Sequence, residues 1–158
     1  MLQSSTNGVS GLRALDGAAK GAGGSTEETR FGTYFPRVFA YAYSLTSDEA
    51  AAKDIVSEAF SHVLAHSKDL SEEEFVVELF STARDLARAS RAAGSTGGNL
   101  TGREQELLAF VFDARLTHEQ IRRLMRTTER ALSAGLLRAL RKLQSGMRAS
   151  AGGSLRLA

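Results

Sequence analysis

Residues 116–144, LTHEQIRRLMRTTERALSAGLLRALRKLQ, carry the clearest fold signal in this chain. Apolar residues recur there at three- and four-residue steps, the period of a helix with one buried face. Thr117 followed by Gln120 fits a capping box, in which a hydroxyl and an amide satisfy free N–H groups at a helix start. The stretch therefore predicts two helices, the first short, joined by about three residues at 126–128.

That arrangement is typical of a helix-turn-helix, whose second helix can enter the major groove of DNA. Seven cations surround it and would suit contacts with DNA phosphates: Arg122, Arg123, Arg126, Arg130, Arg138, Arg141 and Lys142. A plain helical hairpin with a basic surface would have the same pattern, so both interpretations stay open on pattern alone.

The rest of the ordered chain also has helical periodicity, and no useful length alternates with period two. Four pairs fit the capping box just before an apolar run: Thr46/Glu49, Ser71/Glu74, Thr101/Glu104 and Thr117/Gln120. A helix is expected from about Phe31, with Pro36 in its first turn, where a missing N–H costs little. The sequence predicts an all-α protein.

Glycine-rich segments divide the chain. Residues 1–29 contain six glycines and no aromatic residue, which predicts a flexible arm, and residues 149–158 predict a similar tail. Residues 92–99, AAGSTGGN, are typical of a linker. We therefore expect two small helical lobes at 30–91 and 100–148, joined by this short linker.

Charge differs between the two predicted lobes. Residues 30–91 hold 7 Lys+Arg and 10 Asp+Glu, whereas residues 100–148 hold 10 and 5. An acidic first lobe and a basic second lobe suggest a protein partner for one and nucleic acid for the other.

Composition excludes several kinds of site. Without cysteine the chain has no disulfide, thiol catalyst or thiolate metal site. His62 and His66 share a helix face, but no third metal ligand is evident. We expect no catalytic residues, metal or cofactor, and therefore no enzyme. No apolar run is long enough to span a bilayer and no signal pattern opens the chain, so a cytoplasmic protein without membrane insertion is expected.

Four segments in order resemble the extracytoplasmic-function (ECF) sigma factors, which recruit bacterial RNA polymerase to promoters. The first is Tyr34-Phe35-Pro36-Arg37-Val38, followed by a turn with Leu45, Thr46 and Asp48. Residues 52–60, AKDIVSEAF, match an acidic helix of the family, and Phe75, Leu79, Phe80, Ala83 and Arg84 match the next helix. The fourth segment runs from residue 100 through the helix-turn-helix, so that the resemblance covers residues 31–144.

The resemblance implies a sigma region 2-like domain at 30–91 and a region 4-like domain at 100–148. Asp54, Ser57 and Glu58 would bind core RNA polymerase, and an anti-sigma factor would be a further partner. The residues implied to contact promoter DNA are Arg84, Arg88, Arg91, Arg126, Thr128, Arg130, Ser133, Ala134 and Arg138.

Two alternatives remain open. The linker of residues 92–99 spans at most roughly 28 Å fully extended, and Val76, Glu78 and Ser81 stand where the family commonly has Arg and Trp. These features favour a sigma-like mimic that titrates an anti-sigma factor or polymerase without initiating transcription. A stand-alone helix-turn-helix regulator would instead bind DNA without polymerase.

Overall fold

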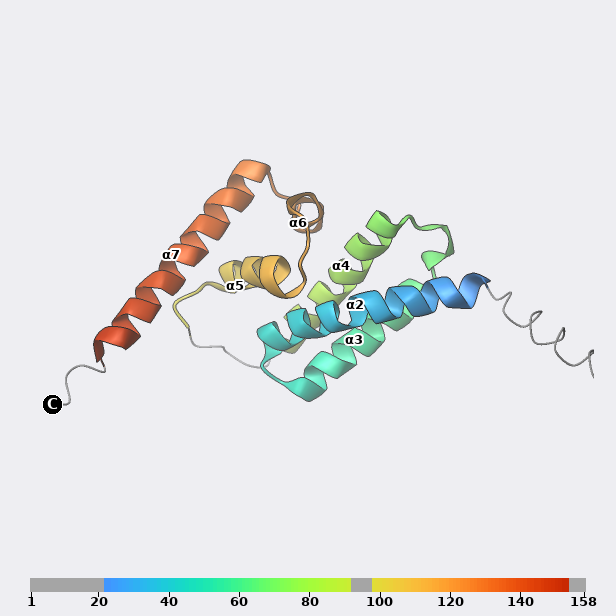
Figure 1. Ribbon diagram of the computed structural model, residues 1–158, viewed down its shortest axis with the longest axis horizontal. Coiled ribbons are helices and arrows are strands. Elements are labelled where there is room, and N and C mark those ends of the chain that lie inside the picture. Colours follow the sequence, from blue (N-terminus) through green and yellow to red (C-terminus); the bar gives the residue numbers. More distant parts are fainter. Residues whose placement is uncertain (1–21, 92–97, 154–158) are drawn as a thin grey trace, which may run out of the picture. The chain divides into compact units, whose positions relative to one another are not determined.

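The computed structural model describes residues 22–91 and 98–153, and every regular element in these ranges is helical (Figure 1). The predicted all-α class is confirmed. The predicted arm up to residue 21, linker residues 92–97 and tail residues 154–158 lie outside the described residues.

The elements follow one another with short connections. They are α2 (Ala22–Thr46), α3 (Glu49–Leu64), the 3₁₀ turn η1 (Ser67–Asp69), α4 (Glu72–Arg91), α5 (Gly102–Leu108), the π-helical turn η2 (Ala109–Asp113), α6 (His118–Met125) and α7 (Glu129–Gly153). The chain divides into two units, Met1–Thr33 and Tyr34–Ala158. The first contributes the start of α2, and all packing described below lies in the second.

Two helices extend beyond their predicted limits. Helix α2 begins at Ala22, within the segment predicted as a flexible arm, and α7 continues to Gly153, within the predicted tail. The prediction that Pro36 lies in a first helical turn is wrong, because Pro36 stands inside α2. The predicted limits followed the apolar periodicity, whereas these helix ends continue past the residues that the core buries.

Three of the four predicted capping boxes are confirmed: Ser71/Glu74, Thr101/Glu104 and Thr117/Gln120. The fourth is wrong. Thr46 ends α2, and the N-cap of α3 is Asp48, whose carboxylate accepts hydrogen bonds from the N–H groups of Ala50 (2.9 Å) and Ala51 (3.3 Å). An aspartate in the right place is as good a cap as threonine.

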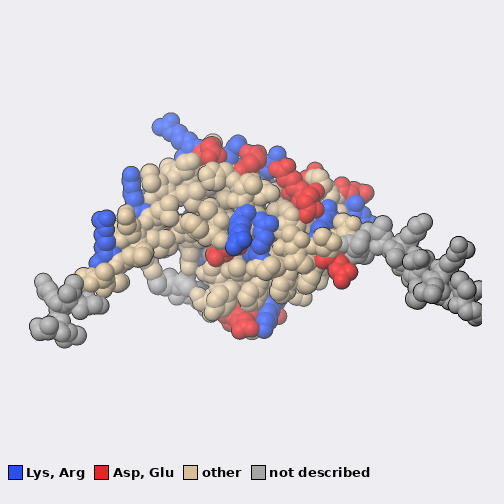
Figure 2. All heavy atoms as spheres, viewed as in Figure 1, with Lys and Arg blue, Asp and Glu red and all other residues tan. Residues whose placement is uncertain are grey.

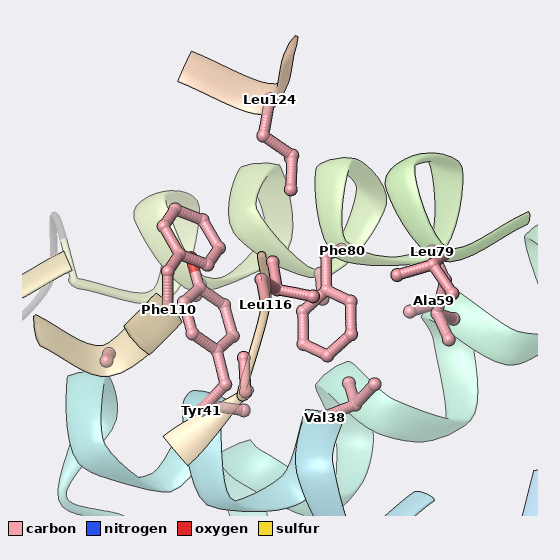
Figure 3. Packing of buried hydrophobic residues seen from close by; sticks show 14 of the residues in the cluster. Val38, Tyr41, Ala59, Leu79, Phe80, Phe110, Leu116 and Leu124 are labelled. Carbon is pink, nitrogen blue, oxygen red and sulfur yellow. The ribbon is translucent and has the colours of Figure 1, made fainter. Parts of the chain in front are cut away.

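One hydrophobic core continues from α2, α3 and α4 into α5, α6 and α7. Tyr41 of α2 lies at its centre, stacked on Phe110 of η2 with ring centroids 4.7 Å apart and meeting Phe80 of α4 edge-on at 5.9 Å (Figure 3). All three rings are fully buried or nearly so. The segments predicted as two lobes therefore share a core, because aromatic residues from both fill the same space.

Candidate nucleic-acid interface

The connection between α6 and α7 has the geometry of a tight helix-to-helix turn. Arg126 ends α6 in the left-handed region, at φ 48° and ψ 51°, and its N–H is directed at the carbonyl oxygens of Arg122 and Arg123. Thr128 then starts α7, its hydroxyl accepting a hydrogen bond from the N–H of Ala131 at 3.3 Å. A left-handed residue usually closes a helix, and a hydroxyl residue usually opens one. The three residues 126–128 thus both stop one helix and start the next.

The turn and the start of α7 present their predicted DNA contacts to the surface. Arg126, Thr128, Arg130, Ser133, Ala134 and Arg138 are all exposed. Leu132 and Ala139, on the other side of α7, are buried. Lys and Arg side chains are visible along the α7 edge in Figure 2. This side of the helix therefore combines positive charge with small residues that let another surface approach closely.

The three predicted DNA contacts of α4 lie elsewhere, against α5. Arg84 donates from Nε to Oε1 of Glu106 at 2.8 Å and from Nη2 to Oε2 at 3.2 Å. Arg88 donates to the same carboxylate at 3.3 Å, and Arg91 donates to Oε1 of Gln105 at 2.7 Å. The Glu106 side chain is only 3% exposed. All three arginines therefore bind acceptors on α5, although the Arg88 side chain stays half exposed.

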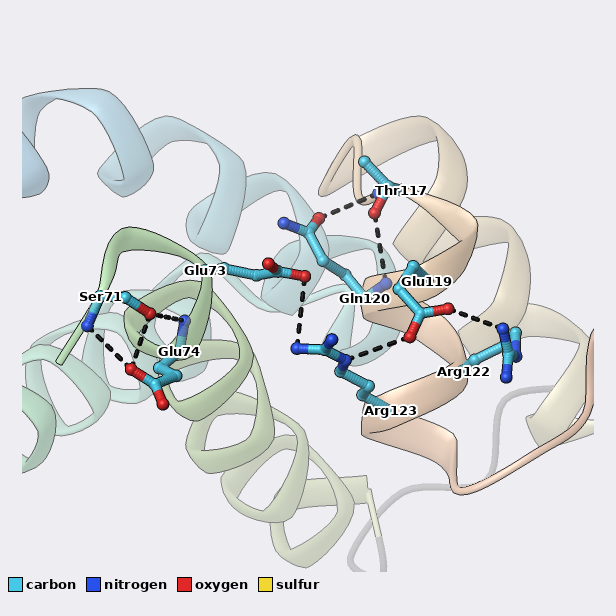
Figure 4. Close-up of polar contacts among 8 residues, drawn as sticks. All are labelled: Ser71, Glu73, Glu74, Thr117, Glu119, Gln120, Arg122 and Arg123. Atoms are coloured by element: carbon cyan, nitrogen blue, oxygen red, sulfur yellow. Dashed lines mark hydrogen bonds and ion pairs between the residues drawn. The ribbon is translucent and has the colours of Figure 1, made fainter.

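A second, exposed set of charges joins α4 to α6. Arg123 lies between Glu73 of α4, at 3.3 Å, and Glu119 of its own helix, at 3.2 Å, and Glu119 also accepts from Arg122 at 2.6 Å (Figure 4). Exposed pairs of this kind contribute roughly 0–1 kcal/mol each. The positive charges of Arg122 and Arg123, two of the seven cations around the predicted helix-turn-helix, are thus partly neutralised.

Helix α3 presents the predicted polymerase-binding residues on one polar side. Asp54, Ser57 and Glu58 are exposed, whereas Ile55 and Ala59 between and beside them are buried. The helical period of the apolar residues was enough to predict this orientation. The exposed side of α3 can therefore offer two carboxylates to a cationic partner.

Sequence reasoning gave no structural role to Arg37 or Glu106. It placed Tyr41 on the apolar face of its helix, but it did not predict the partners of that side chain. Arg37 donates to the carbonyl oxygens of Ala114 at 2.7 Å and Arg115 at 2.9 Å, and burial lowers the pKa of its guanidinium. The Tyr41 hydroxyl is buried with no hydrogen-bond partner in the described part of the chain, and burial raises its pKa. No local pattern signals any of these contacts, because each joins residues far apart in sequence.

His62 and His66 come close at the end of α3, with ring centroids 5.8 Å apart. Within residues 22–91 and 98–153, no group of three His, Asp or Glu side chains could hold a metal ion. No helix in those ranges is long and apolar enough to cross a bilayer.

Comparisons with protein-family models, curated proteins and solved structures give no match to this chain. The proposals that follow therefore depend on its residues and their geometry.

Proposed function

We propose that this protein is a sigma-like transcription factor, which binds core RNA polymerase through α3 and promoter DNA through the turn and start of α7. The observation that carries the proposal is the pair of capped helices around left-handed Arg126, with the exposed basic side of α7 beyond it. The order of sequence segments that resemble ECF sigma factors supports the same assignment.

On the DNA side, Arg130 and Arg138 are the natural phosphate contacts, because both are exposed on α7. Ser133 and Ala134 lie between them and are small enough to approach base edges closely. Recognition helices of this class contact bases with their N-terminal residues while flanking cations hold the backbone. The promoter contact is therefore assigned to α7.

On the polymerase side, Asp54 and Glu58 are one helical turn apart on the exposed side of α3. Two carboxylates at this spacing can meet cationic side chains of a protein partner, and charges at an interface act strongly on association rate and specificity. Ser57 lies beside them and adds a hydroxyl.

The arginines of α4 do not belong to the DNA surface in this arrangement. Arg84 and Arg88 pair with Glu106, and Arg91 donates to Gln105. This engagement also favours a second candidate, a sigma-like mimic that occupies polymerase or an anti-sigma factor without opening DNA. A transcription assay separates the two candidates.

The test measures co-elution with bacterial core RNA polymerase, followed by run-off transcription. The double charge reversal Asp54→Lys/Glu58→Lys should abolish co-elution, because it repels the cations that the carboxylates would meet. The matched control is Asp69→Lys/Glu78→Lys, which reverses two exposed acids outside α3 and should bind like the wild type. Equal binding by both variants would refute the assignment of α3.

Promoter binding by the polymerase complex gives the second readout. Arg130→Ala/Arg138→Ala should weaken it at least tenfold and lower the salt dependence by about two phosphate contacts. The control Lys53→Ala/Lys68→Ala removes the same charge from other elements. Binding of the polymerase complex without transcription would establish the mimic, and tight DNA binding by the isolated protein would indicate a stand-alone regulator.

A further inference from the structure

Helices α4, α5 and α6 line a cavity of about 380 Å³ that is open to solvent and whose lining is dominated by arginine. Arg84, Arg88 and Arg91 come from α4, and Arg103 comes from the first turn of α5. Glu106 supplies the one carboxylate among the lining residues, which leaves a formal charge of +3. Such a concentration of like charge is costly unless an anion offsets it.

The arginines are held in position but are not neutralised. Glu106 holds Arg84 and Arg88, while Arg91 donates to the neutral amide oxygen of Gln105 at 2.7 Å. The Arg91 guanidinium also lies over Gly102, with Nη2 3.6 Å from the place that a Cβ would occupy. The Arg91 guanidinium is therefore close to the first turn of α5.

Arg103 is the most available of the four. Its side chain is exposed and has no hydrogen bond or ion pair with any other described residue. Together with Arg91 it offers planar sets of N–H donors that no carboxylate occupies. Guanidinium groups bind phosphate oxygens with two parallel hydrogen bonds, a match that ammonium groups do not provide.

The shape of the site favours a small ligand over a nucleic-acid backbone. Arg84 is only 15% exposed and forms the inner wall, so a duplex cannot reach it while α4 and α5 are packed together. Met125 of α6 adds an apolar wall, and the volume falls within the range of about 300–1,000 Å³ for small-molecule pockets. A formal charge of +3 among the lining residues favours an anion that carries more than one negative charge.

We propose that this cavity binds a small phosphorylated molecule with at least two phosphate groups, of the pyrophosphate or nucleoside diphosphate class. Arg91 and Arg103 would hold the outer phosphate oxygens, and Arg88 would share its free donors while Glu106 keeps it in place. The proposal does not depend on the proposed transcription role, because the α4 arginines take no part in the assigned DNA surface.

The test is titration calorimetry of the full chain with inorganic pyrophosphate, and then with a nucleoside diphosphate. We expect saturable binding at one site, weaker for inorganic phosphate than for pyrophosphate. Arg91→Ala/Arg103→Ala should lower the affinity at least tenfold, the effect of losing one or more charge-assisted hydrogen bonds. The control Arg141→Ala/Arg148→Ala removes the same charge from exposed positions on α7 and should bind pyrophosphate as the wild type does.

The variant should keep its fold, because neither Arg91 nor Arg103 pairs with a carboxylate among the described residues, and circular dichroism checks this. A Lys pair at the same two positions keeps the charge but loses the planar donors, and we expect it to recover only part of the affinity. Absence of saturable pyrophosphate binding would overturn the proposal. So would equal losses in the cavity variant and the α7 control, or a cavity variant that loses only binding to a short DNA duplex.

Discussion

Replacing Glu106 with alanine tests whether the α4–α5 contact holds the fold together. The carboxylate is 3% exposed and accepts three charge-assisted hydrogen bonds, at 2.8 and 3.2 Å from Arg84 and 3.3 Å from Arg88. Its removal leaves the Arg84 guanidinium, only 15% exposed, without an anion. Breaking a buried pair in this way costs about 3–5 kcal/mol of unfolding free energy.

The lower end of that range applies here. Arg84 keeps a hydrogen bond to the carbonyl oxygen of Leu124 at 3.2 Å, and the Arg88 side chain is half exposed, so water can replace its lost partner. We therefore expect Glu106→Ala to lower the unfolding free energy by about 3 kcal/mol. Since domains of this size are stable by only about 5–15 kcal/mol, that loss is a large fraction of the total.

Urea denaturation followed by circular dichroism measures the loss, with Glu119→Ala as the matched control. Glu119 also pairs with two arginines, but all three side chains are well exposed, and removal of Glu119 should cost no more than about 1 kcal/mol. Should Glu106→Ala cost as little as Glu119→Ala, the α4–α5 ion pair would not be a structural contact of the protein in solution.

Two further predictions concern the packing of α5 and α7. The hydrogen bond from Lys142, at 2.8 Å, and those from the N-cap of α5 hold the pKa of Glu104 at about 2, well below its usual 4.5. Because the folded pKa is the lower one, this stabilisation is present above about pH 5 and is lost as the pH falls toward 2. Lys142→Met should flatten the plot of urea midpoint against pH over that range, and an unchanged slope would contradict the assignment. In α7, Gly146→Ala should raise the unfolding free energy by about 0.5–1 kcal/mol, since open space surrounds a Cβ there. Gly135→Ala should fail to give that gain, because its Cβ would come within 2.8 Å of a buried leucine of α5. A similar gain at both glycines would show that the two helices are not in close contact.

Features that depend on residues within one helical turn could be predicted well from the sequence. The Ser71/Glu74 and Thr117/Gln120 boxes depend on residues three apart, and both form. The Thr46/Glu49 box fails because Asp48, two residues further on, offers a carboxylate to the same helix start. Thr46 and Asp48 are both suitable N-cap residues. Only the path of the chain between α2 and α3 determines which of them caps α3.

The predicted site residues show the same difference between local and long-range contacts. Asp54 and Glu58 are exposed as expected, because their orientation follows from the buried residues of their own helix. Arg84 and Arg88 also stand at regular helical spacing, yet their partner Glu106 is 22 and 18 residues away. No local rule connects these positions, so the sequence could not predict that Arg84 and Arg88 pair with a carboxylate of α5.

The shared core adds weight to assigning DNA contact to α7. Exposing Arg84 to a duplex requires α5 and η2 to leave α4 and α2, which separates Tyr41 from Phe110 and breaks the Glu106 pair. Burial of one large aromatic side chain is worth about 1.5–3 kcal/mol, and the broken pair adds about 3–5 kcal/mol. The cost of opening is then comparable to the whole stability of such a domain. The exposed side of α7 needs no opening, so DNA contact by the free protein should begin there. Use of Arg84 would require a partner whose binding energy exceeds the cost of opening.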